Sequence, residues 1–215
     1  MINKFTLPND CKIILEYKGN VNSLKILCLI LSEAINRDSN NILNLNYSVC
    51  RQITSSFKDR GSVYIQNMIK ICMENESVKS VIDSCDCYDT YATIHFTDAI
   101  NTFSGLNCKK FFFAELQDIF YLKSSESIKL YILIKRNTLY NNAFKHDDLL
   151  SWLGSKHEKS IFRIINRSVC DMNKFGINIK LHKRKDYWHI EKLQERNIND
   201  IGYIDLDDEE ELDDI

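Results

Sequence analysis

The sequence predicts an α+β fold, because segments with the period of an amphipathic helix alternate with short segments typical of strands. In each half of the chain, helices are followed by a β-hairpin, which is the order of elements in a winged helix. The chain has six glycines and one proline among 215 residues. This composition disfavours a loop-rich β-sandwich, which needs turn residues about every 8–12 positions. We expect two tandem winged-helix domains, at residues 1–100 and 111–196, followed by a disordered acidic tail at residues 197–215.

The first half is expected to begin with an irregular or short extended segment at residues 3–18. A helix at residues 24–35 follows, predicted by apolar side chains that recur three or four positions apart. The remaining elements expected in this half are a short extended piece at 42–45, a helix at 48–57, a turn at 58–61, a helix at 62–75, a strand at 78–82, a loop at 83–89 and a strand at 91–96. Residues 97–110 are the expected junction with the second half.

The second half repeats this order without detectable sequence similarity to the first. Its expected elements are an aromatic extended segment with a polar turn at 111–122, a helix at 127–138, a short helix at 148–153, a long helix at 157–175, and strands at 177–181 and 187–190 joined by a loop at 182–186. Asp147 is predicted to cap the short helix, and Gly154 to end it.

Basic residues form a stripe on the long helix of the second half. They are Lys159, Arg163, Arg167 and Lys174, and at about 100° per residue they fall within an arc of about 80°, opposite the apolar face. Four cations in a row without intervening acids fit a row of phosphates or the edge of a major groove. A solvated helix face is the alternative interpretation.

The predicted hairpin that follows carries three more cations near its tip, which are Lys183, Arg184 and Lys185. A basic wing tip can reach a neighbouring groove or the phosphate backbone of DNA. Because the stripe and the wing lie on consecutive elements, together they favour binding of double-stranded DNA by the second half.

The charge of the chain is strongly asymmetric along its length. The net charge is −2, from 28 basic and 30 acidic residues, but eight of the acids lie in residues 205–215 and the remainder carries +6. The candidate partner-binding residues in this tail are Asp207, Asp208, Glu209, Glu210 and Glu211. The tail either competes with DNA for the basic stripe or docks on a host replication or transcription protein. A solvated tail without a partner is the third interpretation.

Several function classes lack support in the sequence. There is no Gly-x-Gly-x-x-Gly turn and no phosphate-binding loop that ends in Gly-Lys-Ser/Thr. The eight cysteines lack zinc-site spacing, since Cys85 and Cys87 have no second pair, and we expect free thiols in a reducing compartment. No apolar run approaches the roughly 20 residues of a membrane span. We expect a cytoplasmic protein with no cofactor, no metal, no membrane contact and no enzymatic activity.

Two strings resemble segments of the plasmid replication initiator family. The residues 122–131, LKSSESIKLY, resemble the segment leading into the opening helix of that family's second domain, and residues 148–154, DLLSWLG, resemble the short helix before its recognition helix. Residues 161–175 and 177–190 match the positions of the recognition helix and the wing. The resemblance implies two tandem winged-helix domains that bind repeated origin sequences, the second reading the major groove and the first supporting dimerisation and further contacts.

The chain departs from the family pattern in two ways, a weakly basic helix at residues 62–75 and the acidic tail. Three functions follow from these observations. The first is sequence-specific binding of double-stranded DNA for replication initiation. The second is a winged-helix transcription regulator of a phage or plasmid. The third is a protein-interaction module whose acidic tail binds a host factor.

Overall fold

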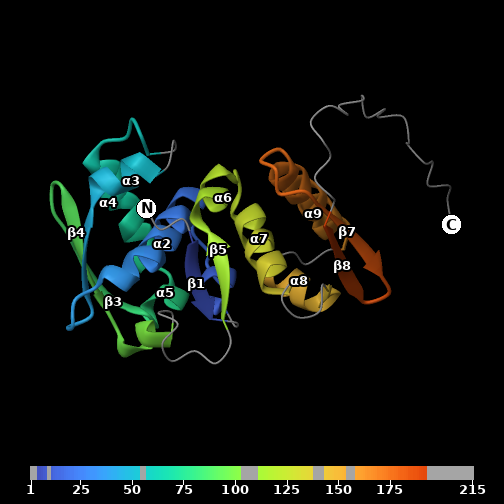
Figure 1. Cartoon of the computed structure of the whole chain (residues 1–215), viewed down its shortest axis with the longest axis horizontal. Helices are drawn as coiled ribbons and strands as arrows, with labels where there is room; N and C mark the ends of the chain where they lie inside the picture. Colours follow the sequence, from blue (N-terminus) through green and yellow to red (C-terminus); the bar gives the residue numbers. More distant parts are fainter. Residues whose placement is uncertain are drawn as a thin grey trace.

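The computed structural model of the chain describes residues 4–8, 11–53, 57–102, 111–137, 143–153 and 158–192. Helices and short strands mix throughout these residues, which confirms the α+β class (Figure 1). The helices are α1 Lys12–Leu15, α2 Val21–Glu33, α3 Tyr47–Ile53, α4 Ser62–Met73, α5 Glu76–Lys79, α6 Leu116–Tyr121, α7 Ser125–Asn137, α8 His146–Leu153 and α9 Glu158–Asn173, with 3₁₀ turns η1 Ala34–Asn36 and η2 Asp98–Thr102. The strands are β1 Lys4–Pro8, β2 Ile42–Asn46, β3 Ile82–Cys87, β4 Tyr91–Phe96, β5 Phe111–Glu115, β6 Ala143–Lys145, β7 Ile179–Arg184 and β8 Tyr187–Lys192.

Helix α2 is the centre of the first half. The Asn20 side chain caps it by accepting hydrogen bonds from the backbone N–H groups of Asn22 and Ser23. Every residue from Ser23 to Ser32 is buried, so the helix is enclosed on all sides rather than amphipathic. It packs against α4, α6 and β1, which brings together parts of both halves of the chain.

Each half contains an antiparallel three-stranded sheet. The order is β2-β4-β3 in the first half and β6-β8-β7 in the second. In the first sheet Leu43 pairs with Ile94 and Leu45 with Ala92, and these four side chains are buried on the face toward the helices. In the second sheet Phe144 pairs with Trp188, and both rings are buried. The helices expected at 24–35, 48–57, 62–75, 127–138, 148–153 and 157–175 are all present over most of their described residues.

The structure corrects several element boundaries. The strand expected at 78–82 is helix α5 followed by the start of β3, and the loop expected at 83–89 is mostly strand β3. Val78 is β-branched, which favours a strand, but its N–H bonds the Asn75 carbonyl in a helical turn that buries the side chain. Residues 3–18 hold β1 and α1, and the polar turn expected within 111–122 is helix α6. Asp147 lies within the first turn of α8 and is not its cap, and Gly154 lies outside the described residues.

A third sheet joins the two halves. Strand β1 at the start of the chain pairs antiparallel with β5, which opens the second half, and Figure 1 shows this ribbon beside the central helices. Leu7 on β1 and Phe112 on β5 are register partners, and both are fully buried. The buried apolar side chains of the two halves form one cluster. The two halves are therefore held together by a sheet as well as by the core.

A buried lysine lies at the same junction. Lys25 of α2 is 4% exposed, and its Nζ donates a hydrogen bond of 2.8 Å to the backbone carbonyl of Phe120 at the end of α6. Burial lowers the pKa of Lys25 to about 8, although the nearby carboxylate of Asp171 acts in the opposite direction. Lys25 thus connects the central helix of the first half to α6.

We predict that replacing Lys25 by Met changes how stability depends on pH. Between the folded pKa of about 8 and the ordinary value of 10.5, the unfolded chain keeps a proton on Lys25 that the folded protein has released. The free energy of unfolding of the wild type should therefore rise relative to Lys25→Met over this range, by about 2–3 kcal/mol. Denaturant unfolding at a series of pH values measures this difference. A difference that stays constant with pH would contradict the burial of the amine.

Candidate nucleic-acid interface

Helix α9 is oriented by the apolar side chains that it packs against α7. Ile161, Ile165 and Met172 are buried along one face of the helix, at intervals of four and seven residues. On the same face, Ser168 Oγ lies 3.3 Å from Ser127 Oγ of α7, in a buried hydrogen bond. This packing fixes the rotation of α9 about its axis and leaves the opposite face in solvent.

The exposed face of α9 carries the predicted basic stripe. Arg163 and Arg167 lie one turn apart and are exposed, and within the described part of the chain neither forms an ion pair. Lys174 follows the last turn and is exposed as well. Lys159 lies in the first turn, but its side chain lies outside the described residues. Three of the four predicted cations are thus exposed along α9 and its C-terminal end.

The wing differs from the expectation in its length. The loop predicted at residues 182–186 is only a turn at Lys185 and Asp186, because strand β7 continues through Arg184. Lys185 has a φ of 53°, the left-handed conformation that closes this turn. Lys183 and Arg184 are successive strand residues, so their side chains leave opposite faces of the hairpin. The three cations therefore do not form one cluster at the tip.

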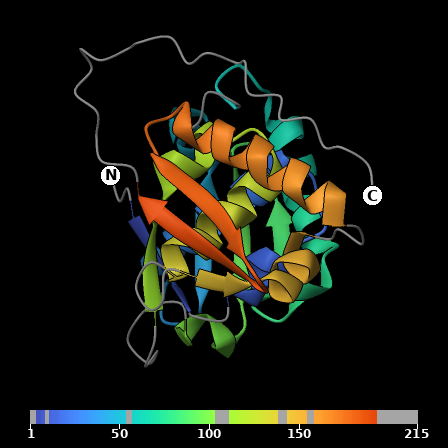
Figure 2. The same cartoon turned by 90° about the vertical axis from the view of Figure 1, so that its right-hand side faces the viewer.

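Aromatic side chains connect the wing to α9. The rings of Phe162 on α9 and Trp188 on β8 lie 5.0 Å apart, and Lys183 Nζ lies 5.5 Å from the centre of the Phe162 ring. Trp188 is 2% exposed, and its indole N–H donates to Nδ1 of His146 on α8 at 3.0 Å. These contacts hold the hairpin beside the exposed face of α9. Figure 2 shows both elements on the face toward the viewer.

One acidic residue offsets part of the positive charge of the wing. Glu191 Oε2 on β8 lies 2.5 Å from Nε2 of His182 on β7. The hydrogen bond with His182 lowers the pKa of Glu191, and the positive charges of Lys180 and Arg184 act in the same direction. The Glu191 carboxylate thus lies among three basic side chains of the hairpin.

The first half presents a different surface at the corresponding helix. Lys70 is the only cation within α4, and Val63 is 67% exposed near the start of the helix. The amide of Gln66 donates to the backbone carbonyl of Tyr88 at 2.8 Å and so ties α4 to the β3–β4 hairpin. The Arg51 guanidinium donates a hydrogen bond to the Arg60 carbonyl and so stabilises the turn before α4. This half lacks a row of exposed cations on its helix, as the sequence predicts.

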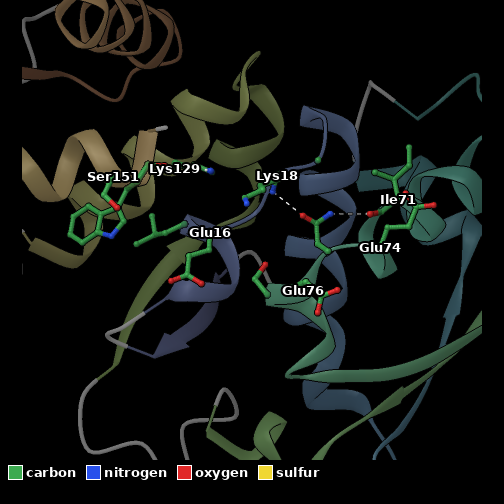
Figure 3. A pocket seen from close by; sticks show the side chains of 12 residues that line it. Glu16, Lys18, Ile71, Glu74, Glu76, Lys129 and Ser151 are labelled. Atoms are coloured by element: carbon green, nitrogen blue, oxygen red, sulfur yellow. Dashed lines mark hydrogen bonds between the residues drawn. The ribbon is translucent and has the colours of Figure 1, made fainter. Parts of the chain in front are cut away.

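A cleft of about 660 Å³ lies between the two halves (Figure 3). It is lined by α1, the ends of α4 and α5, and residues of α7 and α8. Figure 3 shows Lys18 and Lys129 from opposite sides of the cleft, with Glu16 and Glu74 nearby. Burial lowers the pKa of Lys129, and the charge of Lys18 adds to this effect. The cleft carries charges of both signs, so its electrostatics do not select one class of ligand.

Other candidate features are reported for the described residues alone. No three His, Cys, Asp or Glu side chains among them come together as a metal site. No helix in these residues is long and apolar enough to span a membrane. The predicted partner-binding acids of the tail, residues 207–211, lie outside the described part of the chain.

Comparisons with known proteins support the fold but assign no family. No family model matches the chain, and no curated protein sequence matches it. The structure is similar to a crystal structure of the Pi initiator protein in complex with iteron DNA, with a TM-score of 0.61 and 15% sequence identity. The similarity covers 87% of this chain and 96% of that one. At this identity the comparison shows that the two folds are similar and nothing more.

The exposed face of α9 contains a cysteine that allows a direct test of its orientation. Cys170 lies two turns after Arg163 and is exposed, whereas Cys28, Cys50 and Cys72 are buried. We predict that the native protein reacts with a maleimide at Cys170 faster than at these buried thiols. Intact-mass spectrometry of Cys170→Ser should then show one label fewer per chain, while Cys28→Ser should match the wild type. Equal labelling of Cys170→Ser and wild type would show that this face of α9 is covered.

Proposed function

We propose that the chain is a sequence-specific double-stranded DNA-binding protein of the replication initiator type. The observation that carries the proposal is the pair Arg163 and Arg167, exposed and without ion pairs among the described residues, beside a hairpin that aromatic contacts hold in place. Cations that are not in an ion pair can bind phosphates and base edges without first losing another partner. The similar fold of an initiator protein solved with iteron DNA adds support.

In this proposal each half is a winged-helix domain. Helices α7, α8 and α9 with the β7–β8 hairpin form the second domain, and α2, α3 and α4 with the β3–β4 hairpin form the first. Helix α9 enters the major groove, whose width of about 12 Å accepts an α-helix. Arg163 and Arg167 contact base edges there, and Arg184 contacts a phosphate from the wing. Repeated origin sites are the proposed targets.

The first half has a supporting role in the same proposal. Its helix α4 carries one cation and an exposed Val63, so contacts with a second copy or with the DNA backbone suit it better than base reading. We propose no catalytic step for either half, and a cytoplasmic location. The acidic residues 207–211 form the proposed contact with a host replication or transcription protein.

The proposal predicts the behaviour of two sets of variants. Arg163→Ala combined with Arg167→Ala should weaken binding to a duplex that carries the target sequence by about 2–6 kcal/mol, because two base contacts are lost. Arg184→Ala should weaken binding to all sequences and reduce the slope of log K against log salt by about 1. Fluorescence anisotropy across a salt series measures both effects.

A matched control separates base reading from a general loss of charge. Lys12→Ala with Lys79→Ala removes two exposed cations from α1 and α5 and should leave specific binding within about two-fold of the wild type. The wild-type slope should be about −4 to −5, as expected for four to six phosphate contacts. Unchanged affinity in the Arg163/Arg167 variant would contradict DNA reading by α9. Binding at a promoter without repeats would favour a transcription regulator.

The acidic tail gives a separate prediction. Deleting residues 205–215 removes eight negative charges from a chain whose other residues carry +6. If the tail competes for the basic stripe, the deletion should tighten DNA binding, most strongly at low salt where screening is weakest. If the tail instead binds a host replication or transcription protein, the deletion should leave the affinity for DNA unchanged. The purified host protein should then bind the full chain but not the truncated chain. No change in either measurement would leave the tail without a role in binding.

A further inference from the structure

A groove in the first half contains two cysteines that the proposed DNA interface does not use. It lies between α4 and the edge strand β3, has a volume of about 510 Å³, and includes Ile69 and Met73 of α4 among its lining residues. Cys85 and Cys87 of β3 line it as well, and both thiols are free and half-buried. Because they are two positions apart on one strand, both side chains leave the same face. The groove therefore holds a pair of neighbouring thiols.

A buried hydroxyl without a partner lies next to this pair. Tyr47 is fully buried, and its hydroxyl forms no hydrogen bond with any residue that the structure describes. Its pKa is raised by burial and then by the neighbouring Cys87 thiol, and the Gln66 side chain acts in the opposite direction. Since Cys87 and Gln66 both line the groove, the Tyr47 hydroxyl lies close to it. A buried polar atom without a partner costs free energy, which a ligand can recover.

The geometry and chemistry of the two thiols limit what they can bind. Strand geometry puts the Cα atoms of Cys85 and Cys87 about 6.6 Å apart, close to the outer limit for a disulfide, so a direct S–S bond would be strained. Burial raises the pKa of the Cys85 thiol, and the Cys87 thiol adds to this effect, which disfavours the thiolate needed for oxidation. A tetrahedral zinc site needs four ligands, and no three suitable side chains gather among the described residues. The remaining candidate is a ligand in which one atom bonds to both sulfur atoms.

We propose that Cys85 and Cys87 form a binding site for trivalent arsenic in the groove between α4 and β3. Arsenous acid, As(OH)₃, condenses with the two thiols to form two As–S bonds, while two As–OH bonds and two S–H bonds break. Each thiol proton leaves with a hydroxide as water, so two waters are released, arsenic stays trivalent, and no separate oxidant or base is needed. The remaining arsenic-bound hydroxide accepts a hydrogen bond from the Tyr47 hydroxyl, which gains its missing partner.

Two probes distinguish the dithiol from the hydroxyl contact. Phenylarsine oxide condenses with two thiols and releases one water, but its arsenic keeps a phenyl group and no hydroxide. Intact-mass spectrometry of the native full chain should show one phenylarsine adduct that resists excess 2-mercaptoethanol and is removed by a dithiol. Cys85→Ser and Cys87→Ser should each lose this resistant adduct, whereas Cys170→Ser, which removes an exposed thiol elsewhere, should keep it.

The Tyr47→Phe variant tests the geometry without removing a thiol. It should bind arsenous acid about five-fold more weakly than the wild type, because one hydrogen bond is lost, and should bind phenylarsine oxide equally well. Peptide mapping of the wild-type adduct locates the arsenic even if a cysteine variant fails to fold. An adduct on other cysteines, such as the buried Cys28 and Cys72, or one that a monothiol removes, would overturn the proposal. Equal affinity of Tyr47→Phe and wild type for arsenous acid would overturn the role of the hydroxyl.

Discussion

The pairing of β1 with β5 is the constraint on which the arrangement of the two halves depends. It ties the start of the chain to the first strand of the second half, and Leu7 and Phe112 bury their side chains at this junction. The buried side chain of Lys25 on the central helix α2 donates a further hydrogen bond to the Phe120 carbonyl. A buried amine is tolerated only where its hydrogen-bonding capacity is used, so this contact restricts how α6 can sit on α2. Helix α7 contacts both β5 and α9, so it connects α9 to this junction.

The proposed interface depends on the two faces of α9, one packed against the protein and the other exposed to solvent. The apolar face and the Ser127–Ser168 hydrogen bond fix the rotation of the helix about its axis. This rotation determines which side chains of the polar face are exposed to solvent. Arg163 and Arg167 are exposed, and neither forms an ion pair with a residue that the structure describes. The wing is fixed by different forces, since Trp188 is buried against Phe162 and bonded to His146. A rigid helix and a rigid hairpin side by side are suited to binding a partner of fixed shape.

Local patterns in the sequence predict the helices and the basic face well, since both depend on residues three to four positions apart. The exposed Arg163 and Arg167 follow directly from the apolar period of α9. Local patterns do not predict the β1–β5 pairing, because its partners lie more than 100 residues apart, although polar and apolar residues alternate along β1. The sequence predicts a loop over most of strand β3, because the polar residues Asp83, Ser84 and Asp86 are typical of loops, although an edge strand also tolerates them. The contact of Lys183 with Phe162 joins two elements and leaves no local signal.

In the proposed complex, α9 lies in the major groove at each repeat of the target. An iron–EDTA reagent attached to Cys170, two turns from Arg163 on the exposed face, generates radicals that cut DNA near this helix. We expect cuts at the same position in every repeat, and no such cuts when the reagent is applied to Cys170→Ser. Cuts spread evenly along the duplex, or the same cuts from Cys170→Ser, would contradict the placement of α9 in the groove.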